Sequence, residues 1–326
     1  MAQQRGSQVP IIFEEESTFK ELPTGTNAAK LYYVSESLRL NRNLVSSKTL
    51  RGTRNPVMPV RGNVDVTGDI NFELSPNIGK LLRCIFGGTI RTTGGTGAYI
   101  HRFTIGDLPS FTVEKYFSDI DATDKYFQYV GCKVNNFKVT ANTEGFIDSS
   151  ISIMGADELQ DSASMKAGVR DDGHTPFDGF GGSLWVNGSQ VMTIVGVDFT
   201  LENTIDGNTY VMDGTGTRYS MPESIAKVTG TLRGLFTDAD LYTDAINYTE
   251  RKIELRFSRG TGVGTLGNEK LIFFLDEAVL KPQTPVVSGP TGLQVELPFE
   301  AYYDNSTDSD YGALHATLYS SLSTFA

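Results

Sequence analysis

Apolar and polar residues alternate with a period of two along much of this chain. Three segments show the alternation most clearly: residues 64–74 (VDVTGDINFEL), 195–202 (VGVDFTLE) and 293–301 (LQVELPFEA). In each segment, aliphatic and aromatic side chains occupy one set of alternate positions, and mostly charged, amide or hydroxyl side chains occupy the other. This period predicts antiparallel sheets with one packed face and one hydrated face.

Turn signals separate the predicted strands. Asn187-Gly188, between LWV and SQVMTIV, predicts a two-residue hairpin, because both residue types tolerate a positive φ. Pro298 falls on the polar face of its segment and has no backbone N–H, so it predicts the edge of a sheet.

Two segments have the pattern of a short helix. In residues 75–87, Ser75 is the expected N-cap, a proline occupies the first helical position, and Gly87 is the stop signal. Residues 237–248 predict a second helix, with Thr237 as its N-cap and acidic residues in its first turn. Each predicted helix follows a long alternating segment, so the same strand–helix order occurs twice.

The chain contains an internal repeat. Residues 52–59 (GTRNPVMP) and 216–222 (GTRYSMP) share Gly-Thr-Arg and Met-Pro, and VTGDI (66–70) and VTGTL (228–232) follow seven and six residues later. A strand that ends in a polar loop precedes each copy, and a short capped helix follows it. Four features in one order predict a duplication, and two unrelated β-domains are the alternative.

The segment between the two copies, residues 156–183, is rich in Gly, Asp and Ser and has little periodicity, which predicts a linker. The predicted organisation is a first module at residues 1–155, this linker, and a second module at residues 184–326. The predicted fold class is therefore mainly β, with two tandem duplicated modules and one short α-helix beside each.

Composition narrows the possible functions. The 326 residues suffice for about two domains, and a net charge of −11 argues against sequence-specific binding to DNA, whose phosphates are also negative. Cys84 and Cys132 are too few for a disulfide framework and are expected to be reduced thiols. The chain starts without an apolar signal region and its longest apolar run is residues 271–275, so neither secretion nor membrane insertion is expected.

One glycine pattern resembles a nucleotide-binding motif. Gly262, Gly264 and Gly267 spell G-x-G-x-x-G after a strand-like segment. A dinucleotide site requires a helix that begins at the last glycine, whereas the next residues, NEKLIFFLDEAVL, have the bulky aromatic pattern of a strand. The glycines therefore predict a hairpin tip between two strands, and no P-loop lysine follows them.

Other candidate sites lack residues that their chemistry requires. Residues 304–310 place acidic side chains at EF-hand spacing, but Ser309 replaces the turn glycine and His315 replaces the bidentate glutamate, so a solvated acidic loop is expected. The aspartates of residues 118–124 predict a polar turn, and the three histidines are too scattered for a zinc site. No cofactor, metal site or enzymatic activity is therefore predicted.

Four segments resemble the tail tube proteins of long-tailed, non-contractile bacteriophages: residues 11–88, PSFTVEKYF (109–117), YVGCKVNNFKVT (129–140) and PTGLQVELPFEAYYDN (290–305). The resemblance covers most of the chain as a diffuse pattern. It implies β-sandwich or barrel-like modules, each flanked by one helix, whose sheets join around a ring to form an inner β-barrel. Such rings stack into a tube through which viral DNA passes.

The resemblance also implies a long loop in each module that reaches the next ring. By position these loops are residues 41–61 and 203–222. The candidate inter-subunit residues are Arg42, Lys48, Gly52, Thr53, Arg54, Met58, Pro59, Gly216, Thr217, Arg218, Met221 and Pro222.

Two modules per chain predict a pseudo-hexameric ring of three chains, with six chains as the alternative. The implied partners are other copies of the chain, a tape-measure protein, tail-tip and terminator proteins, and viral DNA as a non-specific passing cargo. The implied location is the virion tail, assembled in the cytoplasm of a bacterial host. The alternative function is a capsid-associated or surface glycan-binding β-protein, which would usually display loop aromatics; the one tryptophan, Trp185, lies in a predicted hairpin instead. A carbohydrate-active or calcium-dependent enzyme would require carboxylates that the fold brings together.

Overall fold

The computed structural model describes residues 3–88, 91–95, 97–287, 289, 292–303 and 312–325. The strands up to residue 170, here called the N-terminal half, are β1 (Ile11–Glu15), β2 (Asn27–Leu31), β3 (Ser35–Glu36), β4 (Arg39–Val45), β5 (Val60–Glu73), β6 (Arg91–Gly95), β7 (Ala98–Thr104), β8 (Phe111–Tyr116), β9 (Tyr126–Asn142), β10 (Asp148–Gly155), β11 (Asp157–Asp161) and β12 (Gly168–Arg170). The C-terminal half contains β13 (Gly182–Val186), β14 (Ser189–Gln190), β15 (Ile194–Glu202), β16 (Lys227–Leu235), β17 (Glu250–Ser258), β18 (Lys270–Leu280), β19 (Gln294–Tyr302) and β20 (His315–Ser320). The prediction of a mainly β fold is confirmed.

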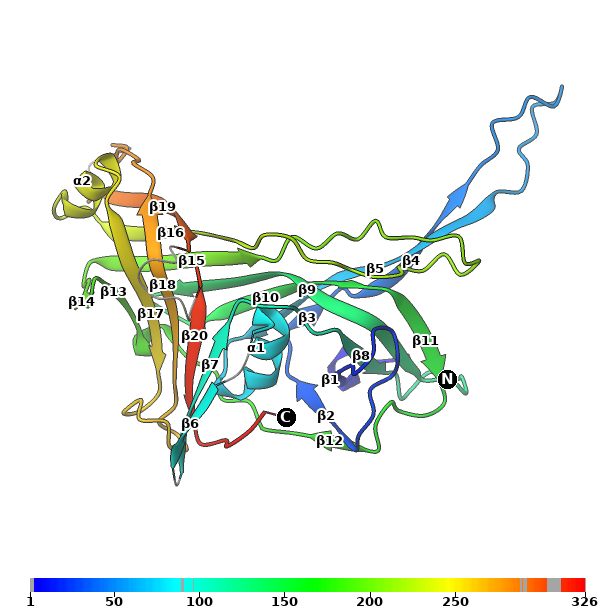
Figure 1. Cartoon of the computed structure of the whole chain (residues 1–326), viewed down its shortest axis with the longest axis horizontal. Helices are drawn as coiled ribbons and strands as arrows, with labels where there is room; N and C mark the ends of the chain where they lie inside the picture. Colours follow the sequence, from blue (N-terminus) through cyan, green and yellow to red (C-terminus); the bar gives the residue numbers. More distant parts are fainter. Residues whose placement is uncertain are drawn as a thin grey trace.

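One antiparallel sheet runs through both halves of the chain. Its strands pair in the order β4, β5, β10, β9, β15, β16, β19, so that β9 and β15 form the joint between the halves (Figure 1). At this joint the register extends from Gly196 opposite Asn142 to Glu202 opposite Asn136. We call these seven strands the continuous sheet.

The remaining strands form a second set of ladders. β18 pairs with β17 along its length and with β20 and β19 on its other side, and β20 continues to β7 and β6. In the N-terminal half, β8 pairs with β1 and with the first part of β9, and β11 pairs with the same part of β9. In Figure 1, β17, β18 and β20 run across the direction of β9 and β15.

The core crosses the joint between the halves. Phe137 of β9, Phe199 of β15 and Phe273 of β18 are fully buried, and the ring centroids of Phe199 and Phe273 lie 5.0 Å apart. Phe273 also contacts Phe137 and Phe257, at centroid distances of 6.0 Å and 6.3 Å. Buried aromatic rings dominate core energetics, so this cluster fixes the two halves to each other.

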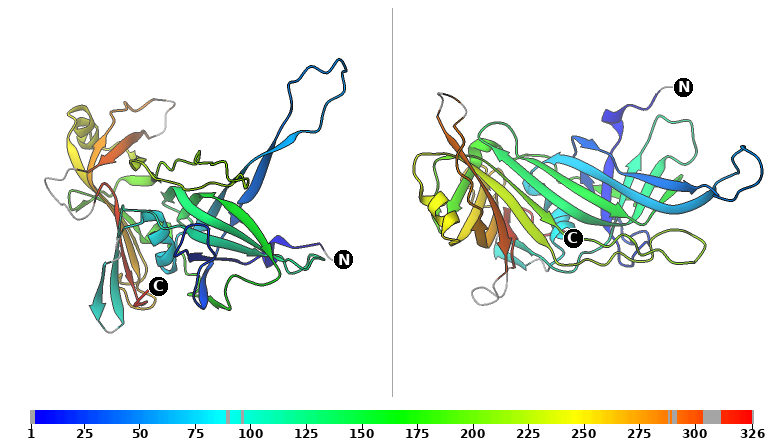
Figure 2. Two further views of the ribbon diagram at one scale, coloured as in Figure 1. Left: turned by 45° about the vertical axis from the view of Figure 1, so that its right-hand side comes forward. Right: turned by 90° about the horizontal axis from the view of Figure 1, so that it is seen from above.

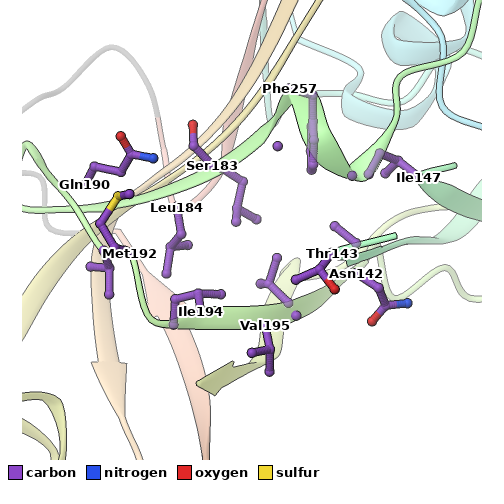
Figure 3. A pocket seen from close by; sticks show the side chains of 17 residues that line it. Asn142, Thr143, Ile147, Ser183, Leu184, Gln190, Met192, Ile194, Val195 and Phe257 are labelled. Carbon is purple, nitrogen blue, oxygen red and sulfur yellow. The ribbon is translucent and has the colours of Figure 1, made fainter. Parts of the chain in front are cut away.

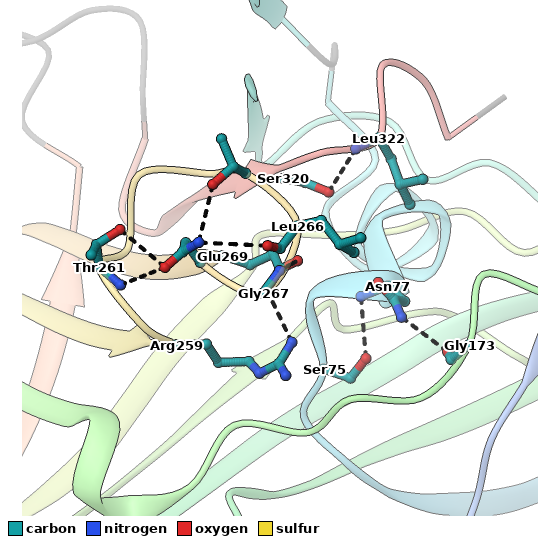
Figure 4. Close-up of polar contacts among 12 residues, drawn as sticks. Ser75, Asn77, Gly173, Arg259, Thr261, Leu266, Gly267, Glu269, Ser320 and Leu322 are labelled. Carbon is teal, nitrogen blue, oxygen red and sulfur yellow. Dashed lines mark hydrogen bonds and ion pairs between the residues drawn. The ribbon is translucent and has the colours of Figure 1, made fainter. Parts of the chain in front are cut away.

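The first predicted helix is confirmed and the cap of the second is corrected. The 3-10 turn η2 (Pro76–Ile78) leads into α1 (Gly79–Phe86), and the Ser75 hydroxyl accepts a hydrogen bond from the Asn77 amide at 3.2 Å (Figure 4). Gly87 ends α1 in the left-handed region at φ 76°. For α2 (Asp240–Ile246), Ala239 is the N-cap and not Thr237, because the carboxylate of Asp238 accepts the Asp240 amide and leaves the threonine outside the helix.

The predicted hairpin agrees with the structure, and the predicted edge does not. Asn187 and Gly188 both have positive φ, 47° and 78°, and connect β13 to β14. Pro298 pairs with Thr231 of β16, and on its other side its carbonyl oxygen accepts the Lys281 amide at 2.7 Å, directly beside the pairing of Leu280 with Phe299. β19 therefore has a neighbour on both sides at Pro298, and the predicted edge is wrong at this residue.

Residues 156–183 contain regular structure. β11 continues β10 onto the first part of β9, β12 pairs in parallel with β2, and the 3-10 turn η3 (Gly179–Gly181) precedes β13. Phe177 in this segment is fully buried. The segment packs largely against the N-terminal half, and its role as a boundary between two modules stays a prediction.

Two long connections leave the continuous sheet. The first arm, residues 46–59, joins β4 to β5 and projects away from the body (Figure 2). The second arm, residues 203–226, joins β15 to β16 and runs along the body towards β5 (Figure 1).

Candidate functional site

The continuous sheet has one polar face. Residues directly opposite each other in an antiparallel pair point to the same side, so the strand registers identify this face. It carries Arg39, Asn41, Asp65, Thr67, Asp69, Asn71, Glu73, Asp148, Ser150, Ser152, Asn136, Lys138, Thr140, Asp198, Thr200, Glu202, Lys227, Thr229, Thr231, Arg233, Glu296 and Glu300. The opposite face holds apolar core residues such as Val66, Phe137 and Phe199.

The polar face is acidic. Eight of its residues are Asp or Glu and four are Lys or Arg, all exposed or half-buried. Part of the charge is paired, since Arg233 lies 2.6 Å from Asp198, and the imidazole of His174 lies 3.0 Å from the Glu73 carboxylate. The excess of carboxylates repels a polyanion such as DNA, and the polar face has few cations that could bind DNA phosphates.

The second arm is anchored by a buried arginine. The side chain of Arg218 is only 5% exposed and forms an ion pair with Asp65. Its guanidinium also donates to the carbonyl oxygens of Gly155 and Val66 in the N-terminal half and, at 2.8 Å, to that of Gly207 in its own arm. Charge-assisted hydrogen bonds to several acceptors satisfy a buried guanidinium and hold the arm in place.

Further contacts fasten the second arm along β5. The Val64 amide donates to the Gly216 carbonyl at 2.8 Å, and the Tyr210 hydroxyl donates to the Val64 carbonyl at 2.9 Å. Lys20 donates to the Thr217 hydroxyl at 2.7 Å. Of the candidate residues predicted in this arm, Thr217, Arg218 and Met221 are buried against the same chain.

An ion pair closes the end of the second arm. Glu223 lies 2.8 Å from Lys133 and accepts the Leu108 amide at 2.8 Å. Burial raises the pKa of Glu223, but the hydrogen bonds from Lys133 and Leu108 outweigh it, so that the net pKa is below its usual value. The carboxylate is therefore charged at neutral pH and holds the arm to β9.

The first arm has the same residue signals and lacks these contacts. Its candidate residues Lys48, Gly52, Thr53, Arg54 and Met58 are exposed, and Pro59 is half-buried. The candidate Arg42 lies before the arm, in β4, and is also exposed. Met58 is 91% exposed, whereas Met221 at the matching position of the repeat is 2% exposed. The structure therefore places one copy of the repeated motif against the body and the other in solvent.

The glycine pattern forms a turn between β17 and β18. Gly262, Gly264 and Gly267 all have positive φ, and the Asn268 side chain accepts hydrogen bonds from the amide and hydroxyl of Thr261 (Figure 4). Arg259 contacts Glu269 at 3.0 Å across the same turn. A strand follows, so the predicted hairpin is confirmed and no helix N-terminus faces the glycines.

The pocket in Figure 3 has a volume of about 160 Å³ and lies beside the joint between the halves. Leu184, Ile194 and Phe257 provide apolar walls, and Asn142 and Gln190 are among its polar side chains. None of the described residues that line it carries a charge. The pocket offers no acid, base or ionised nucleophile for catalysis.

The remaining candidate chemistry is dispersed. Burial raises the pKa of both cysteine thiols, Cys84 and Cys132, which keeps them protonated and unreactive. His101 packs on Phe325, and His315 stacks on Phe274 at a centroid distance of 4.5 Å. Among the described residues no group of three or more His, Cys, Asp or Glu could hold a metal ion.

The structure describes one of the two acidic segments that were predicted to be polar loops. Residues 118–124 form the turn between β8 and β9, whereas the acidic residues 304–310 lie outside the described part of the chain. Among the helices of the described residues, none is long and apolar enough to cross a bilayer.

Sequence reasoning missed the joint between β9 and β15 and the partners of Arg218. The repeat located the arginine, and the alternation located both strands, but neither signal indicates which strands become neighbours. Contacts between Arg218 and Gly155 join residues 63 positions apart in sequence.

Comparison with known proteins gives one family match. The sequence model of a family described as phage tail tube protein matches residues 6–301, which is most of the chain. A search of curated proteins finds no match.

Proposed function

This chain belongs to the phage tail tube protein family, and from that premise we propose that copies of it assemble into stacked rings that form the tube of a bacteriophage tail. The tube is the conduit for viral DNA during ejection. The observation that carries this proposal is the continuous sheet, which has one polar face and, among the described residues, an unpaired outer edge at β4. An open edge of this kind is normally protected in a monomer and is satisfied when another chain pairs with it.

The internal joint suggests how neighbouring copies meet. β15 precedes the second arm as β4 precedes the first, and each strand pairs with the strand that follows its arm. β15 also pairs with β9, and the proposed ring pairs β4 with the corresponding part of a second copy. The strand that corresponds to β9 in the C-terminal half is β18. The expected partner of β4 is therefore the segment that follows β18, residues 281–287, in which Val286 and Val287 are 78% and 74% exposed.

Ring size follows from the number of modules. The order of ladders around β9 and around β18 is similar, since each strand pairs with two later strands along its two parts. This similarity supports two modules per chain, at residues 1–155 and 184–326. Three chains then close a pseudo-hexameric ring, and six chains remain the alternative.

We propose that the acidic polar face lines the lumen of the tube. Closing a sheet into a barrel places one face inside, and like charges along that face let DNA pass without phosphate contacts that must be broken. The subunit has a structural role and no catalytic one. Its further partners are a tape-measure protein and tail-tip and terminator proteins, its location is the virion tail, and its assembly takes place in the host cytoplasm.

Negative-stain electron microscopy of the concentrated protein tests the assembly. We expect hollow tubes or stacked rings, with three chains per ring in the symmetry of end-on views. Protein that stays monomeric, even after tail-tip complexes are added, would contradict the proposal.

The lumen assignment has its own test. The double variant Asp148→Lys, Glu296→Lys adds cations to two exposed positions of the polar face, and Thr243→Lys on α2 is the matched control outside it. Tubes of the double variant are expected to retain short double-stranded DNA at low salt and release it at high salt. Equal retention by both variants would place the polar face outside the lumen.

A further inference from the structure

We infer that the first arm docks onto the C-terminal half of a neighbouring copy, with Arg54 in the place that Arg218 takes within one chain. This inference rests on the proposed self-assembly and adds the docking surface and the anchor residue. The occupant of the docking surface is the first arm of a second copy of this chain. The reason is that the second arm, which has the same motif, already packs against an equivalent surface of this sequence.

The repeated motif identifies the equivalent residues. Gly52-Thr53-Arg54 matches Gly216-Thr217-Arg218, and the Met-Pro pair follows in both arms. The second copy of the motif is buried against the N-terminal half, whereas the first copy is exposed. The arginine and methionine of the second arm are buried against the same chain. The equivalent residues of the first arm are exposed and can pack against the equivalent surface of another copy.

The register of the sheet identifies the receiving surface. The VTG repeat aligns Val66 with Val228, and their cross-strand partners are Gly155 and Ala301. The carbonyl oxygens of Val66 and Gly155 accept from Arg218, so those of Val228 and Ala301 are the expected acceptors for Arg54. Around them the exposed side chains of Ile225 and Tyr302 offer apolar area that the Met58 side chain can cover.

The charge pattern makes the two docking surfaces different. The position of Asp65, the ion-pair partner of Arg218, corresponds to Lys227 in the C-terminal half. On the polar face, the carboxylate of Glu202 lies directly opposite Lys227, on β15. Adjacent strands are about 4.8 Å apart, a displacement that the long arginine side chain can span. Glu202 is therefore the expected ion-pair partner of Arg54. Because the carboxylate lies on a different strand in each docking surface, each surface favours one of the two arms.

The first test compares two arginines of the same exposed arm. Arg54→Met removes the proposed anchor, and Arg51→Met is the matched control, because Arg51 is also exposed and lies outside the repeated motif. The threshold concentration for assembly, measured by sedimentation, is expected to rise about tenfold or more for Arg54→Met, since charge-assisted hydrogen bonds are lost. The melting temperature of the monomer should stay unchanged in both variants, because Arg54 is exposed and forms no hydrogen bond or ion pair with another described residue.

A second measurement locates the arm. Cysteines introduced by Thr53→Cys and Lys227→Cys in one chain are joined by a short bismaleimide, while the two buried native cysteines stay unmodified. Docking between neighbours in a ring predicts a ladder of cross-linked chains that stops at the number of chains in one ring. A ladder that continues beyond this number would show instead that the arm contacts the next ring.

The outcomes separate this inference from the proposed function. If wild-type protein forms tubes and Arg54→Met does so at the same threshold, the docking site is wrong and self-assembly stands. Cross-links confined to single chains would also overturn the docking site. Wild-type protein that never assembles, even with tail-tip complexes, would remove both proposals together.

Discussion

The second arm provides the sharpest test of how this chain holds its own halves together. Arg218→Met keeps much of the side-chain volume and removes the guanidinium that donates to Gly155, Val66 and Gly207 and pairs with Asp65. Breaking a buried charged network costs about 3–5 kcal/mol. Because Asp65 is 43% exposed, water replaces part of its pairing, and about 3 kcal/mol of lost unfolding free energy is the better expectation.

The assay is chemical denaturation combined with amide hydrogen exchange. The variant should lose about 3 kcal/mol in the free energy of unfolding, and the amide of Val64, which donates to Gly216, should exchange faster. Arg61→Met is the control, because Arg61 is exposed and makes one long bond of 3.3 Å to Gly214, so its effect should stay within about 0.5 kcal/mol. An Arg218→Met variant with wild-type stability and unchanged exchange at Val64 would refute the anchoring role.

Three further substitutions test the core, the edge and the charge network. Phe273→Ala removes the ring shared by both halves and should cost about 3–5 kcal/mol in denaturant unfolding; a smaller loss would mean that the halves unfold separately. Gly68→Ala places a methyl group 2.3 Å from the Leu38 Cα and should destabilise the pairing of β5 with the segment before β4 by about 1–3 kcal/mol, seen as faster exchange there. Burial raises the pKa of Asp276, but hydrogen bonds from His315 and Lys252 lower it below the usual 3.8 overall. Its stabilising effect is therefore present above pH 3.8 and lost as the pH falls below it, so Asp276→Asn should be less stable than wild type at pH 7, and the difference should close in denaturation curves below pH 3.8.

Local physics accounts for what could be predicted without coordinates. The alternation of residues 64–74 gave β5, the Asn187-Gly188 pair gave its hairpin, and Gly87 gave the end of α1. The predicted N-cap of α2, Thr237, was wrong: the helix begins at Asp240 with Ala239 as its N-cap, and the Asp238 carboxylate, not the Thr237 hydroxyl, accepts the Asp240 amide. The strand after Gly267 was predictable because its aromatic residues cannot begin a dinucleotide-binding helix.

By itself, the sequence determined the strands, the repeated Gly-Thr-Arg motif and an acidic balance, because these depend on the period and chemistry of neighbouring residues. Only the tertiary structure decided that β9 pairs with β15, that the charges of seven strands share one face, and that Arg218 is buried while Arg54 is exposed. The two arms have nearly the same motif, and their surroundings differ. In the second arm, Arg218 donates to the carbonyls of Val66 and Gly155 within its own chain, whereas Arg54 of the first arm is exposed and makes no such contact with the described residues. Pairing across long sequence separations depends on packing of the whole chain, which no local pattern encodes.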